Sequence, residues 1–214
     1  MTAFFVLLIT IVTAVACALI GNFMVLRRLS LMGDAISHSI FPGIIVAFFL
    51  AGSLNSPLFF LLAVIFALMM AAFIQWISEN VKVSSESIVG IVFTALFAFG
   101  VILLVRFANN VHLDQDAVLY GQVEFSAFDR LMVAGVDLGP RALWTMGFVL
   151  ILNLAMILIF YKELKLSTFD PAFAKSLGFS PRKIHYLLIT LIAITVVSAF
   201  EAVGAVLVVA LLIV

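Results

Sequence analysis

Two ionisable side chains, Asp34 and His38, stand four residues apart in the apolar stretch MGDAISHSIFPG at residues 32–43. A spacing of four residues places both side chains on one face of a helix, one turn apart. A carboxylate and an imidazole in this arrangement are candidate ligands for a divalent transition-metal ion. The structural alternative is that Asp34 caps the helix or pairs with Arg28, while His38 hydrogen-bonds to a neighbouring helix.

Glu201 is a second acid embedded in apolar sequence, between Phe200 and the stretch AVGAVLVVALLIV. Ionisable groups inside a membrane segment are costly unless they are paired or hydrated. Glu201 is therefore expected either to line a hydrated pathway, as a pathway or gate residue, or to lie at a helix end near the membrane interface.

Two loop segments carry further candidates. The side chains of His112, Asp114 and Asp116 suit manganese or zinc, although an ordinary solvated loop is the favoured interpretation. The segment 170–181, DPAFAKSLGFSP, predicts a short amphipathic helix that starts at a proline and stops at a glycine. Its apolar stripe consists of Phe173, Ala174 and Leu177, and is expected to contact either a partner protein or the bilayer surface.

The composition indicates that these residues lie in an integral membrane protein. Hydrophobic residues make up 66% of the 214 residues and charged residues only 10%, against about 25% charged residues in average soluble domains. The formal net charge is zero, so no basic excess points to nucleic acid. The motifs GxxxxGK[ST], HExxH and GxSxG are all absent from the sequence, and we expect no enzymatic activity from the chain itself.

Apolar runs of about 20 residues predict the membrane spans. They indicate five clear spans and an ambiguous C-terminal stretch that is too long for one upright crossing, with a helix break expected at residues 198–204. Gly90, Thr94 and Ala98 form a small-residue face on the span between Glu86 and Arg106, where another helix could approach closely. The predicted fold is an all-α polytopic transmembrane bundle of six to seven spans, forming a single domain over residues 1–214.

Lysine and arginine residues are distributed unequally between the two sides of this predicted bundle. One set of alternate loops contains Arg27, Arg28, Lys82, Lys162, Lys165, Lys175, Arg182 and Lys183, and the other contains Arg106, Arg130 and Arg141. Since positively charged loops tend to stay in the cytoplasm, an outside N-terminus is predicted, with 107–140 as an external segment.

Several separated motifs resemble, in order, the metal-ion permease family of ATP-binding-cassette importers for manganese, zinc and iron. The motifs are LMGDAISHSIFPG, SSESIVGIVFTALFAFG, HLDQDAVLYGQVEF, FDPAFAKSLGFSP and EAVGAVLVVALLIV. Family members usually continue past the LLIV segment into at least one more helix, so the resemblance implies a chain truncated at its C-terminal part.

The resemblance implies a permease subunit in the cell membrane that works with three kinds of partner: a cytoplasmic ATPase dimer, an external or periplasmic metal-binding protein, and a second permease copy. A homodimer is expected and a heterodimer is the alternative. Asp34 and His38 match the metal pathway, whereas family members vary at the position of Glu201. The residues that match the ATPase-coupling helix are Asp170, Pro171, Phe173, Ala174, Leu177 and Gly178.

The implied function is ATP-driven import of a divalent metal, with Mn²⁺ as first choice and Zn²⁺ or Fe²⁺ as alternatives, and with no permanently bound cofactor. A secondary transporter driven by an ion gradient is the alternative, with Glu201 and His38 as its proton relay. A metalloenzyme is disfavoured because the pair supplies two ligands where a catalytic zinc usually has three.

Overall fold

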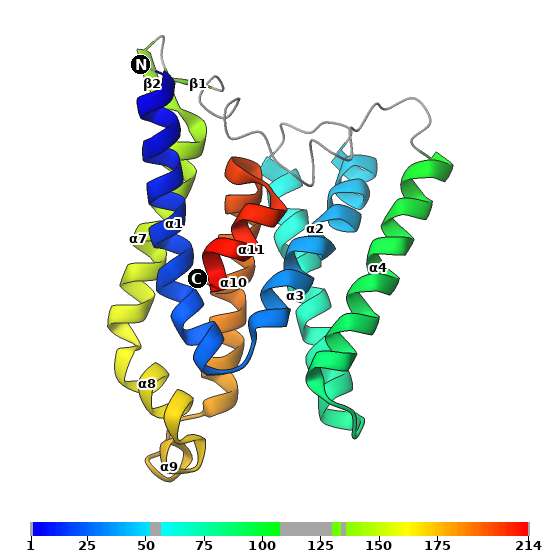
Figure 1. Cartoon of the computed structure of the whole chain (residues 1–214), viewed down its shortest axis with the longest axis vertical. Helices are drawn as coiled ribbons and strands as arrows, with labels where there is room; N and C mark the ends of the chain where they lie inside the picture. Colours follow the sequence, from blue (N-terminus) through cyan, green and yellow to red (C-terminus); the bar gives the residue numbers. More distant parts are fainter. Residues whose placement is uncertain (1, 52–56, 108–129, 134–135, 214) are drawn as a thin grey trace.

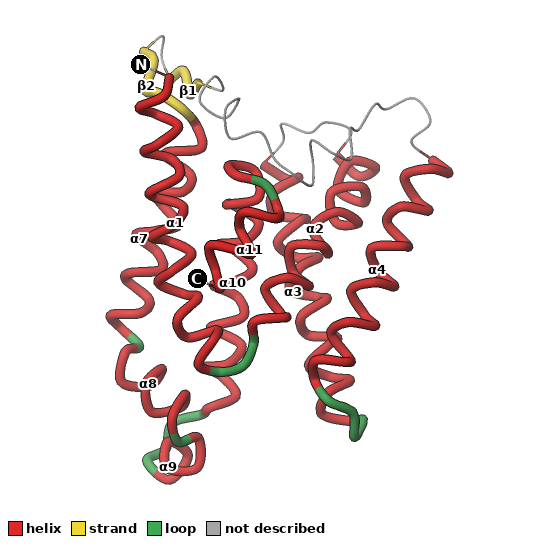
Figure 2. Tube along the Cα trace, in the orientation of Figure 1, coloured by secondary structure: helices red, strands yellow, loops and turns green. Residues whose placement is uncertain are grey.

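The computed structural model describes residues 2–51, 57–107, 130–133 and 136–213, which form a bundle of long, roughly aligned helices (Figures 1 and 2). The long helices are α1 (Thr2–Leu26), α2 (Ser30–Ala51), α3 (Pro57–Asn80), α4 (Ser85–Phe107), α7 (Arg141–Ile159) and α10 (Pro181–Val203). The short helices are α8 (Tyr161–Phe169), α9 (Pro171–Ser176) and α11 (Ala205–Ile213).

The outer surface of the bundle is apolar, as expected for helices in lipid. Five helices within the described residues are long and apolar enough to cross a membrane. On α7, for example, Phe148, Ile151 and Leu158 are each about two-thirds exposed. The predicted helical transmembrane bundle is confirmed.

Helix α10 is the central element of the bundle. In its span Pro181–Phe200, 61% of the residues are buried, against 22–33% in the other four candidate spans. Leu188, Ile192 and Val196 recur every four residues on its buried side. Because α10 packs against α1, α2, α3 and α7, it joins the parts of the bundle to one another.

The predicted C-terminal helix break occurs at Gly204. This residue has φ 82° and ψ 164°, a backbone conformation that favours glycine, and it separates α10 from α11. Helix α11 then packs on α1 and α2 (Figure 1). At its closest approach to α1, the backbone of Leu212 lies directly against Gly21.

A small β-hairpin was not expected from the sequence. Strands β1 (Arg130–Val133) and β2 (Val136–Pro140) pair antiparallel, with an irregular register between Arg130 and Met132, and β2 leads directly into α7. The all-α prediction therefore holds for the membrane bundle, whereas the segment before α7 contains this hairpin at one end of the molecule (Figure 1).

The small-residue face of α4 is largely exposed in the part of the chain that the structure describes. A Cβ added at Gly90 would meet no atom within 4 Å, and Thr94 and Ala98 are exposed. The buried residues of α4 include Val89 and Val92 instead. The helix thus packs on α2 through its larger side chains.

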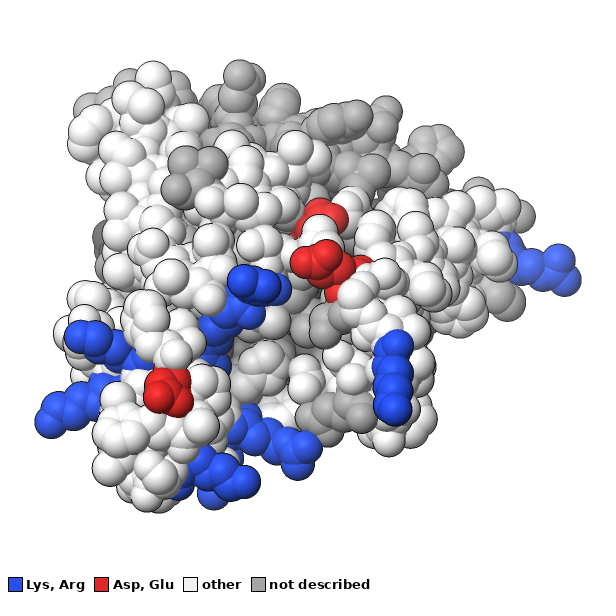
Figure 3. All heavy atoms as spheres, turned by 60° about the horizontal axis from the view of Figure 1, so that its bottom comes forward, with Lys and Arg blue, Asp and Glu red and all other residues white. Residues whose placement is uncertain are grey.

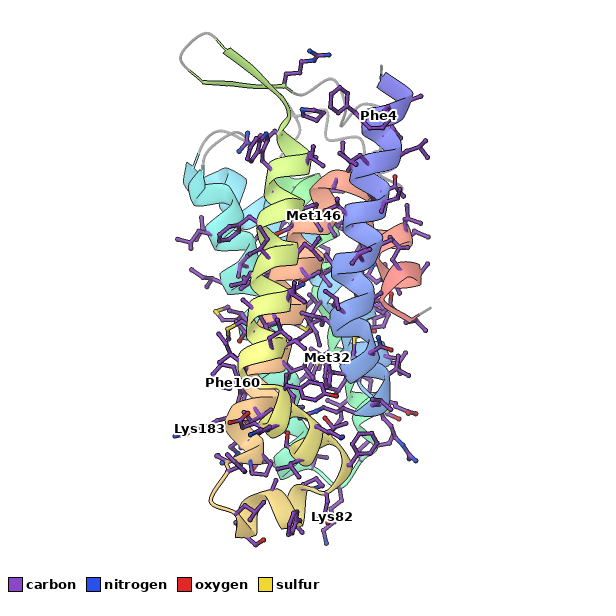
Figure 4. All side chains as sticks on the ribbon, turned by 90° about the vertical axis from the view of Figure 1, so that its left-hand side faces the viewer. Phe4, Met32, Lys82, Met146, Phe160 and Lys183 are labelled. Atoms are coloured by element: carbon purple, nitrogen blue, oxygen red, sulfur yellow. The ribbon has the colours of Figure 1, made fainter. Side chains whose placement is uncertain are left out.

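Basic residues gather at one end of the bundle, as the loop pattern predicted. The end that carries α8 and α9 presents most of the Lys and Arg side chains in view (Figure 3). Lys82 and Lys183 lie at this end, whereas Phe4 lies at the opposite end (Figure 4). The described basic residues are therefore concentrated at the end that carries α8 and α9.

Candidate metal site and coupling surface

Asp34 and His38 lie together on α2, as predicted. The His38 Nε2 atom is 3.4 Å from the Asp34 Oδ1 atom, and about a third of each side chain is exposed. Helix α2 begins at Ser30, four residues before Asp34, so the capping alternative for Asp34 is wrong. The separation of 3.4 Å is longer than a good hydrogen bond, and both side chains are partly exposed, so a cation could reach both atoms.

Two aromatic rings of α4 hold the His38 imidazole in place. Phe93 stacks on it with centroids 5.4 Å apart and an angle of 22°, and Phe97 meets it edge-on at 5.8 Å and 82°. On the same turn of α2, Ser37 is buried and donates a hydrogen bond to the Gly33 carbonyl oxygen. Neither ring was predicted as part of the site, although their spacing of four residues places both on one face of α4.

The pair supplies two metal ligands, one nitrogen and one oxygen. Among the residues that the structure describes, no group of three or more His, Cys, Asp or Glu side chains is placed to hold a metal ion. Within the described residues, the pair would therefore supply only two of the ligands of a bound cation. Partial coordination of this kind suits an ion that must also leave its site.

The segment after α8 folds as the short helix that its sequence predicted. The Asp170 Oδ1 atom accepts a hydrogen bond of 2.9 Å from the Phe173 backbone N–H, Pro171 opens α9, and Gly178 follows its end with φ 85°. Phe173 and Leu177 are half exposed, whereas Ala174 is fully buried. The expectation that Ala174 belongs to an exposed apolar stripe is wrong, because α9 packs back onto the chain at this residue.

Arg27 is a structural residue that the sequence analysis did not single out. It follows α1, and its guanidinium donates hydrogen bonds to the hydroxyl oxygens of Ser167 and Thr168 on α8. Partial burial lowers the pKa of this guanidinium below its usual value. No signal in the sequence pairs residues that lie 140 positions apart.

Asn153 joins three helices at the centre of the bundle. It is fully buried on α7, and its Nδ2 atom donates to the Thr195 hydroxyl on α10 at 2.9 Å and to the Ala16 carbonyl on α1 at 3.3 Å. Buried amides of this kind hold membrane helices together by hydrogen bonds that lipid cannot replace.

The side chains of four predicted site residues lie outside the described part of the structure. Glu201 belongs to the last turn of α10, three residues before Gly204, but its side chain lies outside the described part of the structure. His112, Asp114 and Asp116 lie outside the described residues altogether. Their roles stay predictions from the sequence.

Comparisons with known proteins agree with the fold and with the motifs. The model of the ABC 3 transport family matches residues 2–214. The zinc transport system membrane protein TroD of Treponema pallidum is 49% identical over 97% of this chain, and the manganese transport system membrane protein MntD of Bacillus subtilis is 43% identical over 95%. The solved structure "PsaBC from Streptococcus pneumoniae in complex with Fab" covers 97% of this chain and 68% of its own, with TM-score 0.75 and 31% identity.

This chain spans 56% of the length of TroD and 69% of MntD. The names of both relatives describe membrane proteins of transport systems, in agreement with the expectation of a transport subunit rather than an enzyme. Because the family model covers nearly every residue and the identities extend over nearly the whole chain, this protein belongs to the ABC 3 transport family.

Proposed function

We propose that this chain is the permease subunit of an ATP-binding-cassette importer that moves a divalent transition metal into the cytoplasm. The observation that carries the proposal is the Asp34–His38 pair, an oxygen and a nitrogen ligand 3.4 Å apart on a helix of a membrane bundle. An intramembrane ionisable pair is a functional site by default, because its burial in lipid would otherwise be costly. Relatives named for zinc and manganese transport support the metal class.

The metal site of this proposal is shared between two permease copies. Each copy contributes Asp34 and His38, which together give two carboxylates and two imidazoles around one ion. Such a set replaces part of the hydration shell of the ion without binding it permanently. Manganese is the first ion to test and zinc the second, since oxygen and imidazole ligands suit both.

The partners of this proposal follow from the two ends of the bundle. The basic end is cytoplasmic, which places the N-terminus outside the cell membrane. An ATPase dimer docks on α9 there, through the exposed side chains of Phe173 and Leu177. A metal-binding protein delivers the ion at the opposite, external or periplasmic, end.

The source of energy distinguishes this proposal from a gradient-driven transporter, for which the family match gives no support. The test is uptake of radioactive manganese and zinc into liposomes that contain the full transporter complex. We expect uptake that requires ATP and persists when ionophores collapse proton and sodium gradients. Uptake that is abolished by the ionophores and independent of ATP would contradict the proposal.

A further inference from the structure

Residues 27–29 form a stiff connection between α1 and α2. The Arg28 N–H donates to the Val25 carbonyl at 2.9 Å, and the Leu29 N–H donates to the Met24 carbonyl at 2.9 Å. Arg28 has φ 57°, the left-handed conformation that closes a helix with this hydrogen-bond pattern. The Met32 N–H then donates to the Leu29 carbonyl at the start of α2. A displacement of this connection is therefore passed to both helices.

The connection also joins two groups of packed helices. Helix α1 packs mainly on α7, α10 and α11, whereas α2, which carries Asp34 and His38, packs mainly on α3 and α4. Asp34 lies four residues beyond the start of α2, about 6 Å along the helix axis. The candidate metal ligands thus stand one turn away from the connection.

Arg27 fastens this connection to α8. Its Nε donates to the Thr168 hydroxyl at 2.9 Å, and a terminal nitrogen donates to the Ser167 hydroxyl. Both hydroxyls also donate to the Leu164 carbonyl, which fixes their positions on α8. Within the described residues, Arg27 forms no ion pair with a carboxylate, so these hydroxyls on α8 are its polar contacts.

Helix α8 leads directly into the proposed docking helix α9. Asp170 separates α8 from α9, and Ala174 of α9 is fully buried against the chain. A groove of about 370 Å³, lined by residues that include Arg27, Thr168 and Pro171, lies beside these hydrogen bonds. Arg27 thus links the α8–α9 region by hydrogen bonds to the connection that leads to α2.

We propose that Arg27 is a positioning residue that transmits movement of α8 and α9 to the start of α2, and so couples ATP hydrolysis to the Asp34–His38 site. This inference rests on the proposed function. In this proposal the movement passes from α8 to α2 through the two hydrogen bonds of Arg27 and the turn at residues 27–29, rather than through the apolar packing of the bundle.

The test compares metal transported per ATP hydrolysed in liposomes that contain the complete transporter, with manganese as the probe. We expect Arg27→Gln to lower this ratio about tenfold or more, because losing charged hydrogen bonds weakens the link between α8 and the connection by about that factor. Arg28→Gln is the matched control, because it removes the same charge from an exposed neighbour. The double variant Ser167→Ala/Thr168→Val should lower the ratio as Arg27→Gln does, and combining all three changes should add no further loss.

Assembly is measured in parallel by co-purification of the ATPase and by the melting temperature of the complex. An unchanged ratio in Arg27→Gln, or an equal loss in Arg28→Gln, would overturn the inference. It would also be overturned if uptake and ATP hydrolysis fell together with the melting temperature, since Arg27 would then only support the fold. If the unmodified complex moved no manganese with ATP, the proposed function itself would fail.

Discussion

Replacing Gly21 with alanine tests the contact between α1 and the helix that follows the break at Gly204. A Cβ at position 21 would lie 2.1 Å from the Leu212 carbonyl oxygen, whereas ordinary contact begins at 3.4 Å. Because this oxygen belongs to the backbone, it cannot rotate away, and α1 and α11 would have to separate by about 1.3 Å. A gap of this size removes much of the dispersion attraction between the two helices. Overpacking of this kind costs about 1 to 3 kcal/mol.

Gly90→Ala is the matched control for this variant, because its added Cβ would meet no atom within 4 Å. At either position, replacing glycine with alanine favours the helical backbone by about 1 kcal/mol. The difference between the two variants therefore isolates packing, and we expect Gly21→Ala to be less stable than Gly90→Ala by about 1 to 3 kcal/mol. Equilibrium unfolding in mixed micelles measures both values. Equal stabilities would refute the close packing of α11 on α1.

Two further variants test the central polar contact and the docking surface. Thr195→Val removes one of the two acceptors of the Asn153 amide, and the unfolding free energy should fall by about 0.6 to 1.7 kcal/mol. Thr190→Val is the control: it removes only a bond to the Tyr186 carbonyl of the same helix, and the unfolding free energy should change less. Leu177→Asp places a charge on the half-exposed docking surface. Leu177→Asp should abolish co-purification of the ATPase without lowering the melting temperature. Ser176→Asp is the control and should keep the ATPase bound. Retention of the ATPase by Leu177→Asp would contradict the docking assignment.

Features specified by nearby residues were predictable from the sequence. The spacing of four residues between Asp34 and His38 sets their common face, and this relation needs only a helix. Proline and glycine similarly specify the start of α9 and the break after α10, since each acts on its own backbone. These signals survive in a membrane protein because they depend little on the surrounding medium.

The packing faces of the helices were not predictable in the same way. Lipid is as apolar as the interior of the bundle, so no polar stripe distinguishes the packed side of α4 from its lipid side. The small residues at Gly90 and Thr94 suggested one face, whereas Phe93 and Phe97 pack on His38 from another. The contacts of Arg27 and Asn153 depend on tertiary structure between distant segments, which no local pattern encodes.

The measurement that tests the central claim most directly is ATP-driven uptake of radioactive manganese and zinc by the full transporter carrying His38→Ala or Asp34→Asn. Ser37→Ala is the control, because its hydroxyl bonds to the Gly33 carbonyl within α2 and lies next to the pair without belonging to it. We predict near-complete loss of uptake in both site variants, with the ATPase still bound, and normal uptake in the control. Normal uptake by both site variants would contradict the assignment of Asp34 and His38 to the metal pathway.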